Sequence, residues 1–283
     1  MTRLVALIGT PLKRRHSVVM HNAAFDAADI DARYELMEIE ADAVPGVVAA
    51  ARGPDFLGLG VTAPYKRIVA ELVDEVERDA QAIGAVNNVV RTDDGRLTGI
   101  NTDAPGFRAA VELAMGRSVR GTEVVVAGAG GAAHAVVYAL LTAGAARVTV
   151  GSRSVDAARG LVDRLSTVGD CLSTELAGDA FFAAVRSADL AVNATTVGMI
   201  DPGMTIDVDA LPDHATVFDL VYVPPETDLI RSARARGLRA SNGSEMLIQQ
   251  AAIAFERWTG VGGMADVMRE AVAPLLADAT VIA

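Results

Sequence analysis

The stretch TEVVVAGAGGAAHAVVYALLTAGAARVTVGSRS, residues 122–154, decides the fold of this chain. It indicates a β-branched strand, a glycine-rich turn, an alanine-rich helix and a second strand, which together have the size of a mononucleotide-binding βαβ unit. In its GAGGAA segment Gly128 permits the tight turn, Gly130 lets backbone amides approach a pyrophosphate, and Ala133 is small enough for helix–strand packing. The pyrophosphate would lie at the positive end of the helix. We therefore predict dinucleotide binding; the alternative is a tight strand–helix turn without a ligand.

The end of the second strand, GSRS at residues 151–154, indicates which dinucleotide is bound. Proteins that bind NAD usually carry Asp or Glu there for the ribose hydroxyl, and this segment has no acid. Arg153, between Ser152 and Ser154, can pair with a 2′-phosphate, which a carboxylate would repel. The segment favours NADP over NAD, with NAD still possible. The alternatives are that Arg153 caps the next helix, is solvated, or stacks on the adenine of either cofactor.

Composition narrows the class of protein. The 283 residues are 51% hydrophobic with a net charge of −11, which allows a large core but offers no basic surface for nucleic acid. No apolar run approaches the roughly 20 residues that cross a bilayer, and the start lacks the layout of a signal peptide. Cys171 stands alone and is interpreted as a small buried hydrophobe, and the histidines lack metal-ligand spacing. We expect a soluble cytoplasmic protein that binds no metal, nucleic acid or membrane.

Strand-like and helix-like segments alternate along the chain, which indicates an α/β protein. Before the βαβ unit we predict strands at 3–9, 32–40 and 56–62, helices at 17–30, 42–52, 64–84 and 102–116, and a hairpin around the DDG turn at 93–95. After it we predict strands within 189–199, 216–222 and 238–244, and two final helices at 245–260 and 265–279.

Lys66, in VTAPYKRIV at residues 61–69, is the candidate proton donor and acceptor. Among the basic residues only Lys13 and Lys66 are lysines. Pro64 suits the first helical position, so Lys66 would lie in the first turn, where the helix dipole disfavours an ammonium. A lysine in that place can release a proton, which an arginine cannot. The alternative is an ordinary surface lysine.

Asp103, in INTDAPGF at residues 100–107, is the candidate partner of this lysine. Its carboxylate would orient Lys66 and bind a substrate hydroxyl. Because Thr102 or Asp103 also stands where a helix N-cap belongs, the alternative for Asp103 is that cap alone.

Seven segments carry a resemblance to a known family. In chain order they are GLGVTAPYK (58–66), GAVNN (84–88), INTDAPGF (100–107), GAGGAA (128–133), NATTVGM (193–199), DLVYVPPET (219–227) and NGSEMLIQQAAIAF (242–255). They resemble the marker segments of the shikimate/quinate dehydrogenase family, over residues 9 to 260. The resemblance implies two α/β domains that meet at a cleft: a substrate-binding and catalytic domain, 1–103 plus 245–283, and a Rossmann NAD(P)-binding domain, 104–244.

The family implies reversible NAD(P)-dependent oxidation of a ring hydroxyl, as between shikimate and 3-dehydroshikimate. Lys66 and Asp103 match its catalytic pair. The substrate-binding residues implied are Arg15, Ser17, Thr62, Asn87, Thr102, Tyr222 and Gln250. The cofactor-binding residues implied are Gly128, Ala129, Gly130, Gly131, Ala132, Ser152, Arg153, Ser154, Asn193, Thr195, Val221 and Gly243. Family members occur as monomers and homodimers, and we expect a small cyclitol carboxylate as substrate.

The sequence departs from the family pattern at several recognition positions. Arg15 replaces a carboxylate-binding serine, and could bind a carboxylate bidentately, fill the space or point to water. Gly60 replaces an asparagine and is expected to leave room for a bulkier or differently substituted ring. The other departures are Val18 for a proline, Asn88 for a threonine and Glu245 for a glycine.

These departures indicate a divergent family member, acting on shikimate, quinate, an amino analogue or another cyclohexane acid. Two further alternatives are a non-catalytic nucleotide-sensing regulator on the same fold and a folate-linked dehydrogenase of similar two-domain build.

Overall fold

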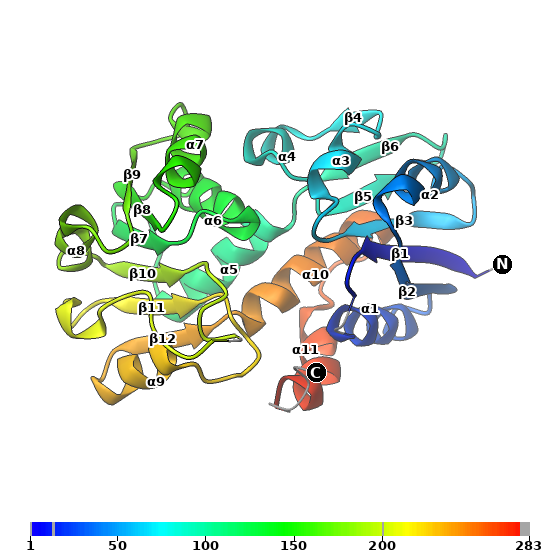
Figure 1. Ribbon diagram of the computed structural model, residues 1–283. Coiled ribbons are helices and arrows are strands. Elements are labelled where there is room, and N and C mark those ends of the chain that lie inside the picture. The colour runs from blue at the N-terminus through cyan, green and yellow to red at the C-terminus, as the bar shows by residue number, and fades with distance from the viewer. Residues whose placement is uncertain (1, 13–14, 200, 278–283) are drawn as a thin grey trace. The chain divides into compact units, whose positions relative to one another are not determined.

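A computed structural model describes residues 2–12, 15–199 and 201–277 (Figure 1). The chain divides into two units, one formed by Met1–Thr102 with Ile248–Leu275 and the other by Asp103–Leu247. Each unit contains one six-stranded sheet with helices packed on it, so the α/β class predicted from the sequence is confirmed. None of the helices described is both long enough and apolar enough to span a bilayer.

The first unit is built on a mixed sheet with the strand order β2-β1-β3-β5-β6-β4. Its strands are β1 (Arg3–Gly9), β2 (Ala32–Glu38), β3 (Phe56–Val61), β4 (Glu75–Val76), β5 (Asn88–Arg91) and β6 (Leu97–Ile100). Its helices are α1 (His16–Ala27), α2 (Val44–Ala50), α3 (Lys66–Ala70), α4 (Arg78–Ile83) and α11 (Ala265–Ala277), with most of α10 (Ser244–Thr259) and a short 3₁₀ turn, Ala41–Ala43. The predicted hairpin is confirmed, since β5 and β6 pair antiparallel.

The single long helix predicted over 64–84 is wrong. The structure has two short helices there, α3 and α4, separated by the strand β4. Glu75 and Val76 pair with Thr98 and Gly99 of β6, so this segment extends the edge of the sheet. Pro64 lies in the turn before α3 and not at its first position. Apolar spacing alone could not reveal that two residues in this amphipathic stretch pair with a distant strand.

Both faces of this sheet are covered (Figure 1). Helices α2, α3 and α4 contribute Val44, Val69 and Ala80 to the core on one face. On the other face α1 meets α10, where the rings of Phe25 and Phe255 lie 5.0 Å apart. The sheet is therefore held between two layers of helices, and the residues at its strand ends are fixed in place.

A buried aromatic cluster on this second face contains His21. Its ring lies 4.4 Å from that of Tyr34 and 5.1 Å from that of Trp258, measured between centroids. The imidazole is 2% exposed, and its Nδ1 has no hydrogen-bond partner among the described residues. Burial lowers the pKa of His21 from 6.5 to about 3, because the charged form would lose its hydration. His21 is therefore neutral in the folded protein.

This burial predicts acid sensitivity. Between pH 6.5 and 3 the unfolded chain binds a proton at His21 that the folded chain does not, so stability is full above pH 6.5 and falls as the pH falls. The expected slope is about 1.4 kcal/mol per pH unit from this one group. Urea unfolding at pH 6 and pH 4.5 should show this slope in the wild type and a flatter one in His21→Leu. An equal slope in both proteins would contradict the assignment.

The second unit is a fully parallel sheet with the order β12-β11-β10-β7-β8-β9. Its strands are β7 (Glu123–Ala127), β8 (Arg147–Ser152), β9 (Cys171–Glu175), β10 (Leu190–Asn193), β11 (Thr216–Asp219) and β12 (Arg239–Asn242). Its helices are α5 (Asp103–Met115), α6 (Gly131–Thr142), α7 (Val155–Leu165), α8 (Asp179–Val185) and α9 (Asp228–Ala235), with a 3₁₀ turn at Val208–Ala210. Read from β9, this is the doubly wound order of dinucleotide-binding folds, whose strand order reverses between β7 and β10.

Alternating side chains of β11 show how this second sheet is covered. Val217 packs with Phe181 of α8 and Leu229 of α9 in one core cluster. Its neighbour Phe218 meets Phe107 of α5 edge-on, with the ring centroids 5.4 Å apart. Both faces of the sheet are thus buried, which explains why a central strand such as β7, EVVVA, is a nearly continuous apolar run.

Candidate active site

The glycine-rich loop follows β7 at the carboxyl edge of the second sheet, where the strand order reverses. Gly128 has φ +113°, and a Cβ there would lie 2.8 Å from the carbonyl oxygen of Ala194, after β10. Its backbone N–H donates to the carbonyl of Gly151 at 2.7 Å. Only glycine meets both demands, so the turn predicted from GAGGAA forms as expected.

The residues after Gly128 form an open cradle. A Cβ on Gly130 or Gly131 would meet no atom within 4 Å. Gly130 is the N-cap of α6, and the first turn of that helix contains no acidic residue. Gly130, Gly131 and Ala132 are exposed, and Ala129 is half-buried. Backbone N–H groups at the positive end of a twelve-residue helix are therefore open to an anion, as a dinucleotide pyrophosphate requires.

Arg153 lies just past the end of β8 and is exposed. Ser154, and not Arg153, caps α7: the Ser154 hydroxyl accepts from Ala157 N–H at 3.3 Å, and Ser152 Oγ accepts from Ser154 N–H at 3.2 Å. The helix-cap alternative for Arg153 is therefore wrong. Within the described residues its guanidinium has no hydrogen-bond or ion-pair partner, so it can bind an external anion.

Asn193 holds the loop after β10 together from inside. Its Oδ1 accepts from the N–H and the hydroxyl of Thr195, at 3.2 and 2.7 Å, and its Nδ2 donates to Asp219 Oδ1 at 2.8 Å. Asn193 is 1% exposed. These bonds give Asn193 a structural role in shaping the loop beside the glycine turn.

Asp219 was not found by sequence reasoning. It ends β11 and is fully buried, and it accepts from the Thr227 hydroxyl at 2.7 Å and from Val221 N–H at 3.0 Å as well as from Asn193. Burial raises the pKa of this carboxyl above its ordinary value, and the hydrogen bonds oppose that shift. The residue orders two candidate cofactor-binding segments at once. Nothing in DLVY distinguishes such a carboxylate from an exposed one before the partners are known.

Gly243 and Val221 lie against each other where β12 ends. A Cβ on Gly243 would lie 2.1 Å from the carbonyl oxygen of Leu220, and its N–H donates to Val221 at 3.2 Å. Val221 is 1% exposed, whereas Tyr222 is half-buried. The glycine permits this close backbone contact, which keeps the segment containing Tyr222 in place.

Lys66 is the first residue of α3, in the first unit, and is half-buried. Val86 N–H donates to the Lys66 carbonyl at 2.9 Å, and the hydroxyl of buried Tyr65 donates to the Ile39 carbonyl at 2.7 Å. Thr62, also half-buried, accepts from Tyr65 N–H at 3.0 Å in the turn before α3. The lysine backbone is thus anchored on both sides. Because α3 has only five residues, the helix-dipole argument from the sequence carries little weight.

Asp103 is the first residue of α5 and begins the second unit. It is half-buried, and Thr102 occupies the position before the helix. The N-cap alternative for Asp103 is therefore wrong, because Asp103 is already the first helical residue of α5 and the cap position falls on Thr102. The role of Asp103 as the partner of Lys66 stays a prediction.

Asn87, Thr102 and Gln250 are brought together in the first unit. Asn87 Nδ2 donates to Thr102 Oγ1 at 3.1 Å, and the Thr102 hydroxyl donates to Gln250 Oε1 at 3.4 Å. Asn87 and Thr102 are 5% and 1% exposed, and Gln250 is half-buried. Three residues from separate segments, each proposed from the sequence as substrate-binding, therefore form one polar cluster.

Ser17 and Arg15 stand at the start of α1. Arg15 precedes the helix and is exposed, while Ser17 is half-buried and hydrogen-bonds the hydroxyl of Tyr34. The same hydroxyl occupies the space beside Gly60, where a Cβ would lie 2.5 Å from it and 3.0 Å from Leu7 Cδ1. The expectation that Gly60 leaves room for a bulkier ring is therefore wrong, because the protein's own tyrosine fills that room.

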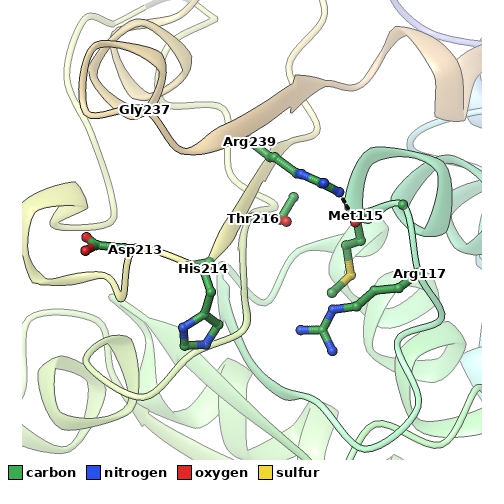
Figure 2. A pocket seen from close by; sticks show the side chains of 9 residues that line it. Met115, Arg117, Asp213, His214, Thr216, Gly237 and Arg239 are labelled. Carbon is green, nitrogen blue, oxygen red and sulfur yellow. Dashed lines mark hydrogen bonds between the residues drawn. The ribbon is translucent and has the colours of Figure 1, made fainter.

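A separate groove of about 510 Å³ lies at the opposite, amino edge of the second sheet (Figure 2). Its basic side chains are already partnered by the protein. Arg117 donates to Asp189 at 2.8 Å, His214 Nε2 lies 3.4 Å from the same carboxylate oxygen, and Arg239 donates to the Met115 carbonyl. The groove therefore ties the end of α5 to the sheet and lies at the edge opposite the glycine loop.

Comparison with known proteins identifies the relatives of this chain. The family model described as "Shikimate dehydrogenase substrate binding domain" matches residues 7–89, and "Shikimate 5'-dehydrogenase C-terminal domain" matches residues 243–273. A shikimate dehydrogenase (NADP(+)) from Methanopyrus kandleri is 41% identical over 276 residues, covering 96% of this chain and 95% of that protein. The chain belongs to the shikimate dehydrogenase family.

Solved structures of the shikimate dehydrogenase family share this fold. A shikimate 5-dehydrogenase from Thermus thermophilus in complex with NADP(H) and shikimate is 35% identical with a TM-score of 0.85, covering 97% of this chain and 99% of that one. A quinate dehydrogenase from Corynebacterium glutamicum in complex with NAD is 34% identical with a TM-score of 0.90, covering 96% and 99%. The family resemblance read from seven short segments is confirmed, and the folate-linked alternative is wrong.

Proposed function

We propose that this protein is an NADP-dependent dehydrogenase that interconverts the ring hydroxyl of shikimate and the ketone of 3-dehydroshikimate. The identity of 41% with a shikimate dehydrogenase (NADP(+)), over nearly the whole of both chains, carries the proposal. The open amides before α6 and the unpartnered Arg153 support NADP, because they suit a pyrophosphate and a 2′-phosphate. We propose a cytoplasmic location and a monomer or homodimer.

NADP, when bound, supplies hydride transfer to and from the ring carbon. In the reductive direction the Lys66 ammonium donates a proton to the developing alkoxide, and in the oxidative direction its amine removes that proton. Asp103 orients the lysine and accepts a hydrogen bond from a neighbouring hydroxyl of the ring. In the proposal, Lys66 therefore transfers the proton and Asp103 holds both Lys66 and the ring in position.

Recognition of the ring is assigned to the polar residues of the first unit and to Tyr222. Asn87 and Gln250 bind ring hydroxyls, and Thr62 is assigned to the same proposed set. Ser17 and Arg15 bind the carboxylate. Arg15 is exposed at the start of α1, where a guanidinium can pair with a carboxylate bidentately.

The carboxylate assignment predicts the effect of Arg15→Ser. Hydrogen bonds between charged groups contribute about 1.5–3 kcal/mol, so the KM for a ring carboxylate should rise about tenfold or more. The KM for NADP should stay unchanged. Steady-state kinetics on shikimate and quinate measure both values, and an unchanged KM for both acids would remove Arg15 from the site.

A panel of ring hydroxy acids tests the proposed function itself. Shikimate, quinate and amino analogues are incubated with NADP or NAD, and formation of the reduced nicotinamide is followed by absorbance. We expect the highest kcat/KM with shikimate and NADP. Quinate is the second candidate, because a quinate dehydrogenase is 34% identical to this chain over nearly the whole of both chains. Cofactor binding without turnover of any acid would support the alternative of a nucleotide-sensing regulator.

A further inference from the structure

Asn88, a residue outside the proposed substrate-binding set, donates two hydrogen bonds within it. Its Nδ2 lies 3.0 Å from Asn87 Oδ1 and 2.9 Å from Thr102 Oγ1, and the side chain is 4% exposed. An amide nitrogen carries two hydrogens. Both hydrogens of Asn88 are therefore committed, one to Asn87, which the proposed function places at the ring, and one to Thr102 beside it.

The Thr102 hydroxyl uses all of its hydrogen-bonding capacity within this cluster. It accepts from Asn87 at 3.1 Å and from Asn88 at 2.9 Å, and it donates to Gln250 Oε1 at 3.4 Å. A hydroxyl has two lone pairs and one proton, so Thr102 has no hydrogen-bonding capacity left for a ligand. Thr102 is the centre that joins three amides.

The same network fixes the orientation of the Asn87 amide. Its Oδ1 accepts from Thr102 N–H at 2.8 Å and from Asn88 at 3.0 Å, and its Nδ2 gives one hydrogen to Thr102 Oγ1. Rotating the amide by half a turn would place two donors against donors and leave buried groups unpaired, which is costly. The second hydrogen of Nδ2 has no partner within the described residues, so this face of Asn87 presents a donor.

We propose that Asn88 is a positioning residue for substrate recognition: it holds Asn87 with an N–H donor directed at a ring oxygen. This inference rests on the proposed function, because the ring oxygen belongs to its substrate. The substrate class follows from the chemistry, since a donor fixed in this way selects a ring with a hydroxyl or keto oxygen at that position over one with hydrogen there.

The strand pairing of the first sheet explains the position of the Asn88 amide. Gly60 of β3 lies directly opposite Asn88 of β5 in the antiparallel pair. Opposed residues share a face, and Tyr34 Oη fills the space beside Gly60. Two departures from the family pattern thus form one cross-strand pair, in which β3 supplies no side chain and β5 supplies the amide.

The experiment compares the wild type with Asn88→Leu and Asn88→Thr. Leucine keeps the approximate volume but donates nothing, and threonine restores one donor. The KM for shikimate should rise about tenfold in Asn88→Leu and less in Asn88→Thr, with the KM for NADP unchanged. Analogues lacking one ring hydroxyl at a time give the second readout. The wild type should discriminate against one of them, and Asn88→Leu should lose most of that discrimination.

A control separates positioning from general stability. Trp258→Phe removes a buried hydrogen bond from Nε1 of Trp258, on α10, to the carbonyl of Val89, which follows Asn88 on β5, at 3.0 Å. This bond is not part of the network of Asn87, Asn88, Thr102 and Gln250. The Trp258→Phe variant should lower the Tm and leave the discrimination between analogues unchanged. Unchanged discrimination in Asn88→Leu, whatever its Tm, would overturn the proposal, and so would an equal rise in the KM for NADP.

Failure of the proposed function is visible separately in the wild type. If the wild type turns over another ring acid of the panel and not shikimate, the function is corrected, and the same comparison on that acid still decides the role of Asn88. If the wild type turns over none of them, both proposals are contradicted.

Discussion

Replacing Lys66 with alanine is expected to lower kcat about 10²–10⁴-fold, the usual contribution of a positioned proton donor. The loss should appear in both directions of the reaction, because the same amine gives and removes the proton. The KM for NADP should remain near that of the wild type. Steady-state and single-turnover kinetics with shikimate measure these quantities.

The structure makes this variant interpretable. The backbone of Lys66 is held by Val86 N–H at 2.9 Å, and the neighbouring Tyr65 is anchored through its hydroxyl at 2.7 Å, so neither contact depends on the lysine side chain. Lys66→Arg is the matched control, since it keeps the charge but cannot release a proton at neutral pH. Both variants should be folded and equally slow. An arginine variant with wild-type kcat would show that Lys66 contributes charge and not a proton.

Removing the Arg153 guanidinium is expected to weaken the preference for NADP over NAD. A charge-assisted bond to phosphate contributes about 1.5–3 kcal/mol, so Arg153→Ala should raise the KM for NADP about 10- to 100-fold. The KM for NAD, which has no 2′-phosphate, should change little. Kinetics with each cofactor at saturating shikimate give the ratio directly.

Arg159 provides the control for this prediction. It lies on the adjacent helix α7, is exposed like Arg153, and pairs with Asp156 at 3.1 Å. Arg159→Ala removes the same charge from the same region and should leave both KM values unchanged. If the two variants weaken NADP binding equally, the effect is general electrostatics and the specific role of Arg153 is contradicted.

The second unit could be predicted from its sequence because its signals are local. A β-branched strand, a glycine turn and an alanine-rich helix follow one another within residues 122–154, so neighbouring segments of the chain form the whole motif. Gly128, with φ +113° and a carbonyl against its missing Cβ, has the conformation that the motif requires. The hairpin of β5 and β6 was equally visible, because the DDG turn lies between its strands.

Features that depend on distant partners were missed. The strand β4 exists only because Glu75 and Val76 meet β6, and the room expected beside Gly60 is filled by Tyr34 from another strand. Asp219 and Asn88 act through hydrogen bonds to Asn193 and Thr102, which lie 26 and 14 residues away in the sequence. Residue types and spacing carry no information about such pairings, so the sequence located the substrate-binding segments without revealing the network that orders them.

Shikimate-dependent reduction of NADP by the wild-type protein tests the central claim most directly. Formation of the reduced nicotinamide is followed by absorbance, with NAD in parallel at the same concentration. The account predicts a rate that saturates with shikimate and is higher with NADP than with NAD. Folded protein that binds NADP but reduces it with none of the ring hydroxy acids would contradict the account.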